Sequence, residues 1–493
     1  MNMLLADLLR AAARDVPDRE AIVSGDTRLT YRELDAGARS VCAAFRDLGI
    51  AAGDVVTIEL PSSAEYLLAY LGAALSGAIV TGINPRLGAR ERAHIVASCA
   101  APLTVDDPHA VVEWARAAPV RSDHPSLRRD PQAPLAIVWT SGTTGVPKGA
   151  VFTLNAMVAV AEGTGELNAA GDRRLSPLPF AHVGFMTRVV DELVNQTTTV
   201  VTPTPWRADA ALALLESERI TVGQGVPAQW SMMLADPLCS SINAAHLRVI
   251  GTGAAAVAPE LVSALRDRFG CPVLVRYTST EAALTSGTRI ADPDHLTCTT
   301  VGRAQPGVEI RIVRASASAS ASAADTDAAE TADVGEVGEI CSRSAAQMSG
   351  YWNDPAATRA TIDSDGWVHS GDLGSTDADG YLTFRGRSKE MFVRGGYNVY
   401  PIEVENVLLE HPAIVRAAVV GAPDDRLGEI GVAFVELDAS LKAPAPTLAD
   451  VRTHVGAHLA DYKRPDRLVV GPIPLTAMLK PDKASLIASL TAS

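Results

Sequence analysis

The sequence lacks the cysteine patterns that build disulfide frameworks or structural metal sites. Its six cysteines are scattered over 493 residues, with no CxxC pair and no histidine at zinc-finger spacing. The sequence therefore predicts neither a disulfide-stabilised fold nor a zinc site. Unpaired thiols of this kind favour a reducing compartment, so we expect a cytoplasmic protein.

Clustered basic residues and long apolar runs are also missing. The chain has 43 Lys and Arg against 57 Asp and Glu, a formal net charge of −14, and no basic patch is visible. Such a balance repels polyanions, which makes nucleic acid and anionic membranes poor partners. The best candidate for a membrane span, residues 67–83, is short and interrupted by glycines, so we expect a helix followed by a buried strand and no stable membrane insertion.

What is present is the alternation typical of an α/β protein. Helical apolar spacing over 34–48 is followed by a β-branched run at 55–60, and the pattern recurs. Near the C-terminus, strand-like segments at 417–421 and 430–437 favour a small α+β domain. An Ala- and Ser-rich stretch followed by acidic residues, 315–333, predicts a flexible insertion between two strands.

The strongest local signal is a loop rich in hydroxyl groups and glycine, TSGTTGVPK, which follows the apolar strand LAIVW. Glycines permit backbone conformations in which successive N–H groups converge on phosphate oxygens, while hydroxyls and a lysine add donors and charge. The spacing does not match GxxxxGK[ST], so we expect a phosphate loop of another kind. The predicted phosphate-binding residues are Thr140, Ser141, Gly142, Thr143, Thr144, Gly145 and Lys148.

A second glycine pattern, GTGAAA at 251–256, matches the GxGxxA fingerprint of dinucleotide-binding proteins. An NAD-dependent oxidoreductase is therefore one alternative, and a nonenzymatic nucleotide-binding module is another. Pro259 and Glu260 are typical of a first helical turn, so the next helix would begin too late to offer its N-terminus to a pyrophosphate.

Several motifs, in order along nearly the whole chain, resemble those of the adenylate-forming superfamily in its acyl- and aryl-CoA synthetase branch. They are the phosphate loop, PLPFAH at 177–182, YTSTE at 277–281, GEI at 338–340 with GYW at 350–352, SGD at 370–372, the segment 386–405, and 474–480. The resemblance implies a large N-terminal domain of two α/β subdomains plus a β-rich subdomain, and a small mobile α+β C-terminal domain. It places these domains at 1–386 and 390–493, with a hinge at 387–389 centred on Lys389.

The activity that the resemblance implies is ATP-dependent ligation of a carboxylic acid to a thiol. The acid would react with Mg²⁺-bound ATP to give an acyl-adenylate and pyrophosphate, and the acyl group would then pass to coenzyme A with release of AMP. An acyl-AMP ligase that loads the phosphopantetheine of an acyl carrier protein is the alternative left open. The amino-acid-activating branch is disfavoured, because its usual Asp is missing from 177–182.

By the same resemblance, particular residues take roles in the nucleotide site. Lys480, with Lys483 in reserve, would neutralise charge that develops at the α-phosphate. Glu281 would hold Mg²⁺, and Thr280 would offer its hydroxyl to a phosphate. The remaining nucleotide-binding residues would be Ala254, Ala255, Tyr277, Asp372 and Arg387.

The other implied residues serve the acid and the thiol. His182 would be the gate beside the acyl pocket, through which the thiol enters. The thiol tunnel would contain Gly395, Gly396, Tyr397 and Lys463. The acyl pocket would be lined by Val183, Gly184, Thr187, Gly225, Gly253 and Thr278.

Overall fold

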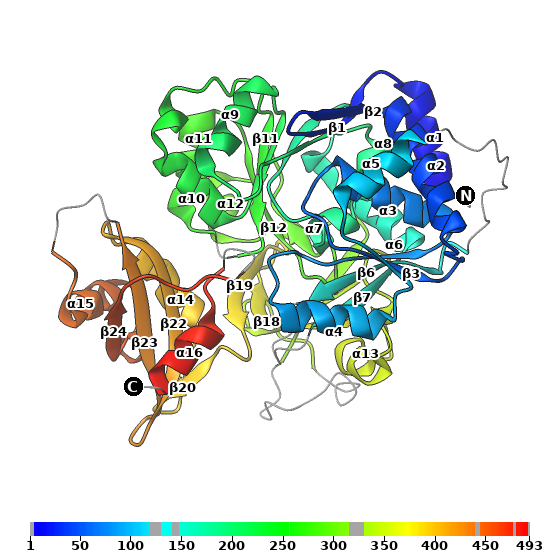
Figure 1. The fold of residues 1–493 in the computed structure, drawn as a ribbon. Coiled ribbons are helices and arrows are strands. Elements are labelled where there is room, and N and C mark those ends of the chain that lie inside the picture. The colour runs from blue at the N-terminus through cyan, green and yellow to red at the C-terminus, as the bar shows by residue number, and fades with distance from the viewer. Residues whose placement is uncertain are drawn as a thin grey trace.

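The computed structural model describes residues 4–117, 130–140, 147–255, 257–314, 330–438, 444–476 and 480–491. A large N-terminal domain with two α/β lobes is joined to a small domain that holds the C-terminus (Figure 1). The strands β18 and β19, yellow in Figure 1, lie between the lobes and the small domain. This arrangement confirms the predicted fold class.

The first lobe is built on a nine-stranded sheet of order β14-β13-β12-β11-β10-β8-β9-β1-β2. Its centre is parallel and its apolar strands are buried, as expected where helices cover both faces. The strands are β1 Glu20–Ser24, β2 Thr27–Thr30, β8 Arg173–Ser176, β9 Thr198–Val201, β10 Val222–Gly225, β11 Val249–Gly253, β12 Val273–Tyr277, β13 Ser286–Gly287 and β14 Arg303–Ala304. The helices packed here include α9 Ala208–Ser217, α10 Pro227–Ala235, α11 Pro259–Phe269 and α12 Asp294–Thr299.

The second lobe contains a six-stranded sheet of order β17-β7-β6-β4-β3-β5. Its strands are β3 Val55–Ile58, β4 Ile79–Gly82, β5 Leu103–Val105, β6 Pro134–Thr140, β7 Lys148–Thr153 and β17 Gly350–Tyr351. The helices of this part are α1 Leu5–Asp15, α2 Tyr31–Asp47, α3 Ala64–Ser76, α4 Ala89–Cys99, α5 Pro108–Arg116, α6 Leu154–Gly163, α7 Val183–Met186, α8 Val189–Val194 and α13 Pro355–Thr361. Segment 67–83 is divided between α3 and β4, and none of the described helices is long and apolar enough to cross a membrane.

The β-rich part is a four-stranded antiparallel sheet of order β15-β16-β18-β19. Its strands are β15 Val308–Val313, β16 Gly338–Ser344, β18 Val368–Thr376 and β19 Leu382–Arg387. The predicted insertion does lie between two paired strands, β15 and β16. Residues 315–329 of that insertion fall outside the described part of the chain, so its flexibility stays a prediction.

The small domain packs helices on a five-stranded sheet. Its strands are β20 Phe392–Arg394, β21 Tyr397–Val399, β22 Ile414–Asp424, β23 Gly428–Leu437 and β24 Arg467–Val470, and its helices are α14 Pro401–Leu409, α15 Leu448–His458 and α16 Lys483–Thr491. Its core includes Val404, Leu408, Val419 and Val451, all at most 1% exposed. The predicted hinge, 387–389, begins at the last residue of β19 and ends before β20, and the exact domain limits remain predictions.

Candidate active site

Three residues predicted to bind the nucleotide meet where β12 ends against β18 and β19. Tyr277, the last residue of β12, donates from Oη to Oδ2 of Asp372 at 2.6 Å. Asp372 lies opposite Arg387 in the β18–β19 ladder, with Arg387 Nε 3.3 Å from its Oδ1. Burial raises the pKa of the Asp372 carboxyl, while Arg387 opposes that shift. We call these three residues the Asp372 group.

A second set of hydrogen bonds positions the backbone next to Asp372. The carboxylate of Glu339, on β16, accepts from Gly371 N and from His369 Nδ1, both at 2.9 Å. The other ring nitrogen of His369 lies 3.4 Å from Oδ2 of Asp363. Burial disfavours the charged ring, but the two carboxylates outweigh it and raise the pKa of His369. Sequence reasoning gave Glu339 and His369 no role.

Lys480 of the small domain lies beside the Asp372 group. Burial and the nearby Arg387 lower the pKa of Lys480 to about 8, while Asp372 and Glu390 act in the opposite direction. Lys483 behaves differently, because its Nζ lies 2.6 Å from Glu390 Oε2 and 2.8 Å from Glu405 Oε1. The structure therefore brings Lys480 to the Asp372 group and ties the reserve candidate Lys483 to two carboxylates.

The end of the predicted phosphate loop is connected to Glu281 through a tyrosine. Strand β17 pairs with β7, and this places Lys148 Nζ 5.2 Å from the ring centroid of Tyr351. Tyr351 Oη donates to Glu281 Oε1 at 2.7 Å. Thr140 ends β6 on the other side of the loop, whereas residues 141–146, including predicted Ser141 to Gly145, lie outside the described residues.

Thr280 and Glu281 follow the end of β12 after two residues, and both are partly exposed. Mg²⁺ prefers oxygen ligands and commonly takes one or two carboxylates together with phosphate oxygens and water. One carboxylate oxygen of Glu281 accepts from Tyr351, which orients the group, and Thr280 is the adjacent residue in the chain. The residues at this position therefore fit the ion.

His182 precedes α7, and its Nε2 lies 3.2 Å from Nδ2 of Asn84. Burial, and after it the charge of Lys480, lower the pKa of His182 to about 4. The imidazole is therefore neutral at pH 7, and Nε2 can accept from the Asn84 amide. The electrostatic effect of Lys480 also shows that the small-domain lysine reaches the side of the site where α7 begins.

The predicted acyl-pocket residues lie near the ends of α7, β10, β11 and β12. At two of the glycines, close packing by itself explains why no side chain is present. A Cβ at Gly225 would come within 2.9 Å of Trp230 Nε1, and one at Gly253 within 2.1 Å of the Arg276 carbonyl oxygen. Thr187 Oγ1 donates to Val183 O at 2.7 Å, within its own turn. Gly184 and the Ala254–Ala255 turn are exposed, and Thr278 is partly exposed.

The residues predicted to form the thiol tunnel lie in the small domain, and no contact among described residues joins them to the Asp372 group. Gly395 and Gly396 form the β20–β21 turn with φ of 59° and 87°. Tyr397 is 59% exposed and stacks on Tyr462 at 4.6 Å between ring centroids. Lys463 pairs with Glu403.

The predicted hinge residue, Lys389, is exposed between two anchored neighbours. On one side, the backbone N and the Oγ of Ser388 both donate to Gly371 O, at 2.9 and 3.0 Å. On the other side, Glu390 is bound by Lys483. Ser388 is thus attached to the large domain and Glu390 to the small one.

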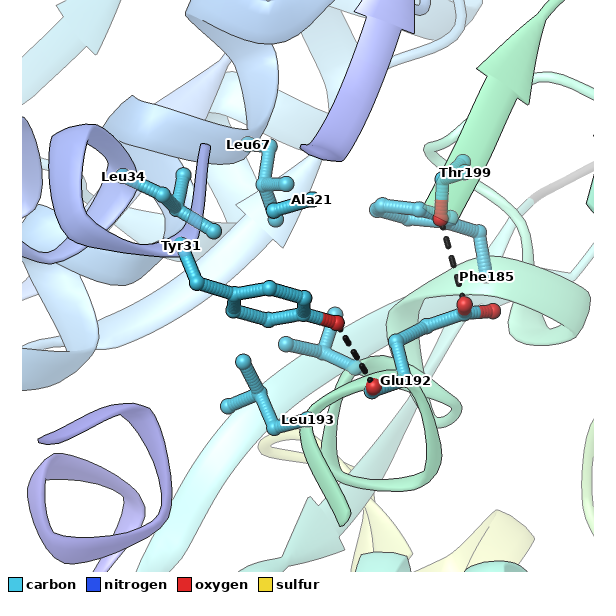
Figure 2. Close-up of a pocket in the computed structure, with 9 residues that line it drawn as sticks. Ala21, Tyr31, Leu34, Leu67, Phe185, Glu192, Leu193 and Thr199 are labelled. Carbon is cyan, nitrogen blue, oxygen red and sulfur yellow. Dashed lines mark hydrogen bonds between the residues drawn. The ribbon is translucent and has the colours of Figure 1, made fainter. Parts of the chain in front are cut away.

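A separate small cavity, of about 10 Å³, lies among α2, α3 and α8 (Figure 2). Tyr31 points across it and donates to the backbone oxygen of Glu192 at 3.0 Å. The Glu192 side chain accepts from Thr199 Oγ1 at 3.1 Å. None of the predicted site residues lines this cavity, so it is distinct from the candidate active site.

Comparison with known proteins now separates the alternatives. Residues 9–352 match the AMP-binding enzyme family, and residues 403–480 match the C-terminal domain of AMP-binding enzymes. The chain belongs to this family. The predicted membership of the adenylate-forming superfamily is thereby confirmed. The dinucleotide-binding alternative is not supported, and α11 indeed begins at Pro259, well after the glycines of 251–256.

Similarity to members of this family extends over the whole chain. Indoleacetate–CoA ligase of Aromatoleum aromaticum is 33% identical, with 96% of each chain covered. Long-chain-fatty-acid–CoA ligase FadD13 of Mycobacterium tuberculosis is 31% identical over 94% of this chain and 93% of its own. Among solved structures, the ATP-bound RpMatB-BxBclM chimera B3 has a TM-score of 0.88 at 25% identity, covering 100% of this chain and 99% of its own.

Proposed function

We propose that the chain is an AMP-forming acyl-CoA synthetase, an acid–thiol ligase that activates a carboxylic acid with ATP and passes the acyl group to coenzyme A. The observation that carries the proposal is the placement of half-buried Lys480, from the small domain, beside Asp372 and Arg387 of the large domain. Relatives that cover the chain from end to end and are named CoA ligases support the same reaction.

In the first half-reaction, the acid's carboxylate oxygen forms a bond to the α-phosphorus and the bond to pyrophosphate breaks. Asp372 offers acceptor oxygens to the ribose hydroxyls, and Arg387 donates to ribose or phosphate. Lys480 supplies positive charge at the α-phosphate, where charge develops during displacement. Mg²⁺, held by Glu281 with Thr280 beside it, would neutralise charge on the departing pyrophosphate.

In the second half-reaction, the thiol sulfur attacks the acyl carbon and the bond to AMP breaks. Rotation about Lys389 would withdraw Lys480 and bring the Gly395–Gly396 turn to the site, where backbone without side chains leaves space for a pantetheine arm. Neutral His182 can swing without breaking an ion pair, which suits a gate for the thiol. Its known partner is the Asn84 amide.

Release of pyrophosphate and AMP tests the proposal directly. A panel of carboxylic acids is incubated with Mg·ATP, with and without coenzyme A, and the wild type is compared with Lys480→Ala. We expect acid-dependent pyrophosphate release and coenzyme A-dependent AMP release, both lost or strongly reduced in the variant. Acid-dependent pyrophosphate without any response to coenzyme A would instead indicate a carrier-protein acceptor. All six cysteines are free thiols, which suits the cytoplasmic location that we expect.

A further inference from the structure

Two arginines reach the interior of the large domain beside the predicted acyl pocket. Arg188 directly follows Thr187 and precedes α8. Arg276 lies on β12, two residues before Thr278, and its carbonyl oxygen packs against Gly253. The two arginines therefore come from separate elements, each next to a predicted pocket residue, although sequence reasoning assigned neither of them to the pocket.

The charge of Arg188 is balanced by its own neighbours. Its Nε and Nη2 donate to Asp191 Oδ2 at 3.2 and 2.8 Å. Asp191 is fully buried and also lies 3.6 Å from Arg174, which in turn pairs with Glu192. The two guanidinium groups and two carboxylates thus balance one another, so these four residues offer no net negative charge to Arg276.

Unlike Arg188, Arg276 has no carboxylate that balances its charge at close range among the described residues. Its side chain is half-buried, and its Nη1 donates to the Thr288 carbonyl oxygen at 2.6 Å. Among the described residues it makes no ion pair within 4 Å. Burial, and then the charge of Arg188, lower the pKa of Arg276 to about 10. A guanidinium that is partly withdrawn from water and has no ion-pair partner is unfavourable, and an anion in this position would relieve that cost.

The nearest acidic residues are committed elsewhere. Asp292 accepts from Tyr381 Oη at 2.8 Å and from Arg289 N at 2.7 Å. Glu166 is exposed and accepts from Ile290 N at 2.8 Å. The chain also makes room for the guanidinium, since a Cβ at Gly287 would come within 2.2 Å of Arg276 Nη1. The space for the arginine is therefore built into the fold, while its counter-anion is missing from the surrounding side chains.

We propose that Arg276, backed by Arg188, binds a second carboxylate on the acid substrate, so that this enzyme activates dicarboxylic acids. This inference rests on the proposed function. A guanidinium matches a carboxylate through two parallel hydrogen bonds, which gives geometric selection as well as charge. The carboxylate at Arg276 takes no part in the reaction. The other carboxylate is adenylated, and its acyl group then passes to the thiol. The product is a thioester with a free carboxylate at its far end.

Matched acids test the proposal. Straight-chain monocarboxylic acids are compared with the α,ω-dicarboxylic acids of the same carbon number, by acid-dependent pyrophosphate release with Mg·ATP. In the wild type, the best dicarboxylic acid should exceed its monocarboxylic partner in kcat/KM by at least about tenfold, the equivalent of one charge-assisted hydrogen bond. Arg276→Met, which keeps the length of the side chain without charge, should lower kcat/KM for dicarboxylic acids by about 100-fold and leave that for monocarboxylic acids unchanged or higher.

The control variant is Arg219→Met, which removes the same charge from an exposed position after α9 and should not alter the preference. Thermal unfolding of each variant shows that it is folded, and binding of a dicarboxylic acid to ATP-loaded enzyme should raise the Tm of wild type but not of Arg276→Met. A wild-type preference for monocarboxylic acids, or an equal loss for both series in Arg276→Met, overturns the inference and leaves the proposed function intact. Absence of pyrophosphate release with every acid would count against the proposed function, and absence of any Tm shift with dicarboxylic acids overturns the inference independently.

Discussion

Lys480 and Lys483 are three residues apart and both are withdrawn from water, yet their surroundings have opposite effects. Lys480 lies three residues before the start of α16, beside the Asp372 group of the large domain, and its pKa is lowered to about 8. Lys483 begins α16, and Glu405 and Glu390 raise its pKa despite burial. Burial alone therefore does not decide the state of a lysine, because close carboxylates reverse its effect.

The different surroundings of the two lysines suit a structural role for Lys483 and a nucleotide-binding role for Lys480. Lys483, Glu390 and Glu405 all belong to the small domain, so their ion pairs would move with it unchanged. Lys480 has no carboxylate within 4 Å among the described residues, and an anionic nucleotide would complete its surroundings. Because no close carboxylate binds the Lys480 amine among the described residues, the amine can bind the phosphate of an incoming nucleotide.

The sharpest test of this comparison is to remove each amine in turn. Lys480→Ala should lower the rate of adenylate formation by about 10³-fold, the scale of losing one strong donor to developing charge. Conversion of supplied acyl-adenylate to thioester should stay within a few-fold of wild type, because that step does not use the amine. Pyrophosphate release and thioester formation are measured separately. Equal loss of both steps, or a larger adenylation defect in folded Lys483→Ala, would reverse the assignment.

The comparison also requires that Lys480 can leave the site while the Lys483 ion pairs persist. Lys389→Pro restricts the backbone between the two domains and should slow thioester formation by about 100-fold while sparing adenylation. Lys389→Ala, which keeps an ordinary backbone, should retain both steps. Stopped-flow measurement of each half-reaction distinguishes them, and unchanged turnover in the proline variant would remove Lys389 from the role of hinge.

The two lysines should also differ in their effect on stability. Lys483→Met leaves Glu390 and Glu405 without their shared cation and should cost about 2 kcal/mol, between the values for an exposed and a buried ion pair. Because the folded-state pKa of Lys483 is raised, this stabilisation is fully present below its ordinary value of 10.5 and is lost as pH rises past the folded-state value. Lys480→Met should leave Tm unchanged or higher at pH 7. Thermal unfolding of both variants checks the contrast, and equal destabilisation would contradict it.

The smallest expected effect is a pH dependence. With its pKa near 8, Lys480 loses its charge in the free enzyme as pH rises, so kcat/KM for ATP should fall by about half at pH 8 and by about tenfold for each further unit. Lys480→Arg keeps the charge throughout this range and should abolish the decline, even if its rate is lower. A decline that persists in the arginine variant would belong to another group.

Much of the nucleotide side could be predicted from sequence, since its residues lie in short motifs. Tyr277, Asp372, Arg387 and Lys480 were each marked by their local pattern, and the structure brings them together. Tyr351 lay in a recognised motif, but its position between Lys148 and Glu281 depends on the pairing of β17 with β7, about 200 residues away in sequence. Local pattern cannot give such a contact.

The binding site for the carboxylic acid could not be predicted as well, because its selectivity depends on single residues on separate elements. Arg188 and Arg276 belong to no motif, and 88 positions separate them in the sequence. A usable signal did exist, since each interrupts an apolar segment, VGFMTRVV and VLVRY, in which a charged residue is costly without a partner. Pocket shape and net local charge depend on how distant elements pack.

The bonds on either side of Lys389 limit how the enzyme can move between its two half-reactions. Ser388 donates to the carbonyl oxygen of Gly371, the residue before Asp372 on β18. Glu390 accepts from Lys483, the first residue of α16. Two more bonds cross the hinge, because Glu390 N and Met391 N both donate to Arg387 O at 3.1 Å. A rotation about Lys389 would have to break these two bonds, so their strength would help to set how often the small domain leaves the pose described above.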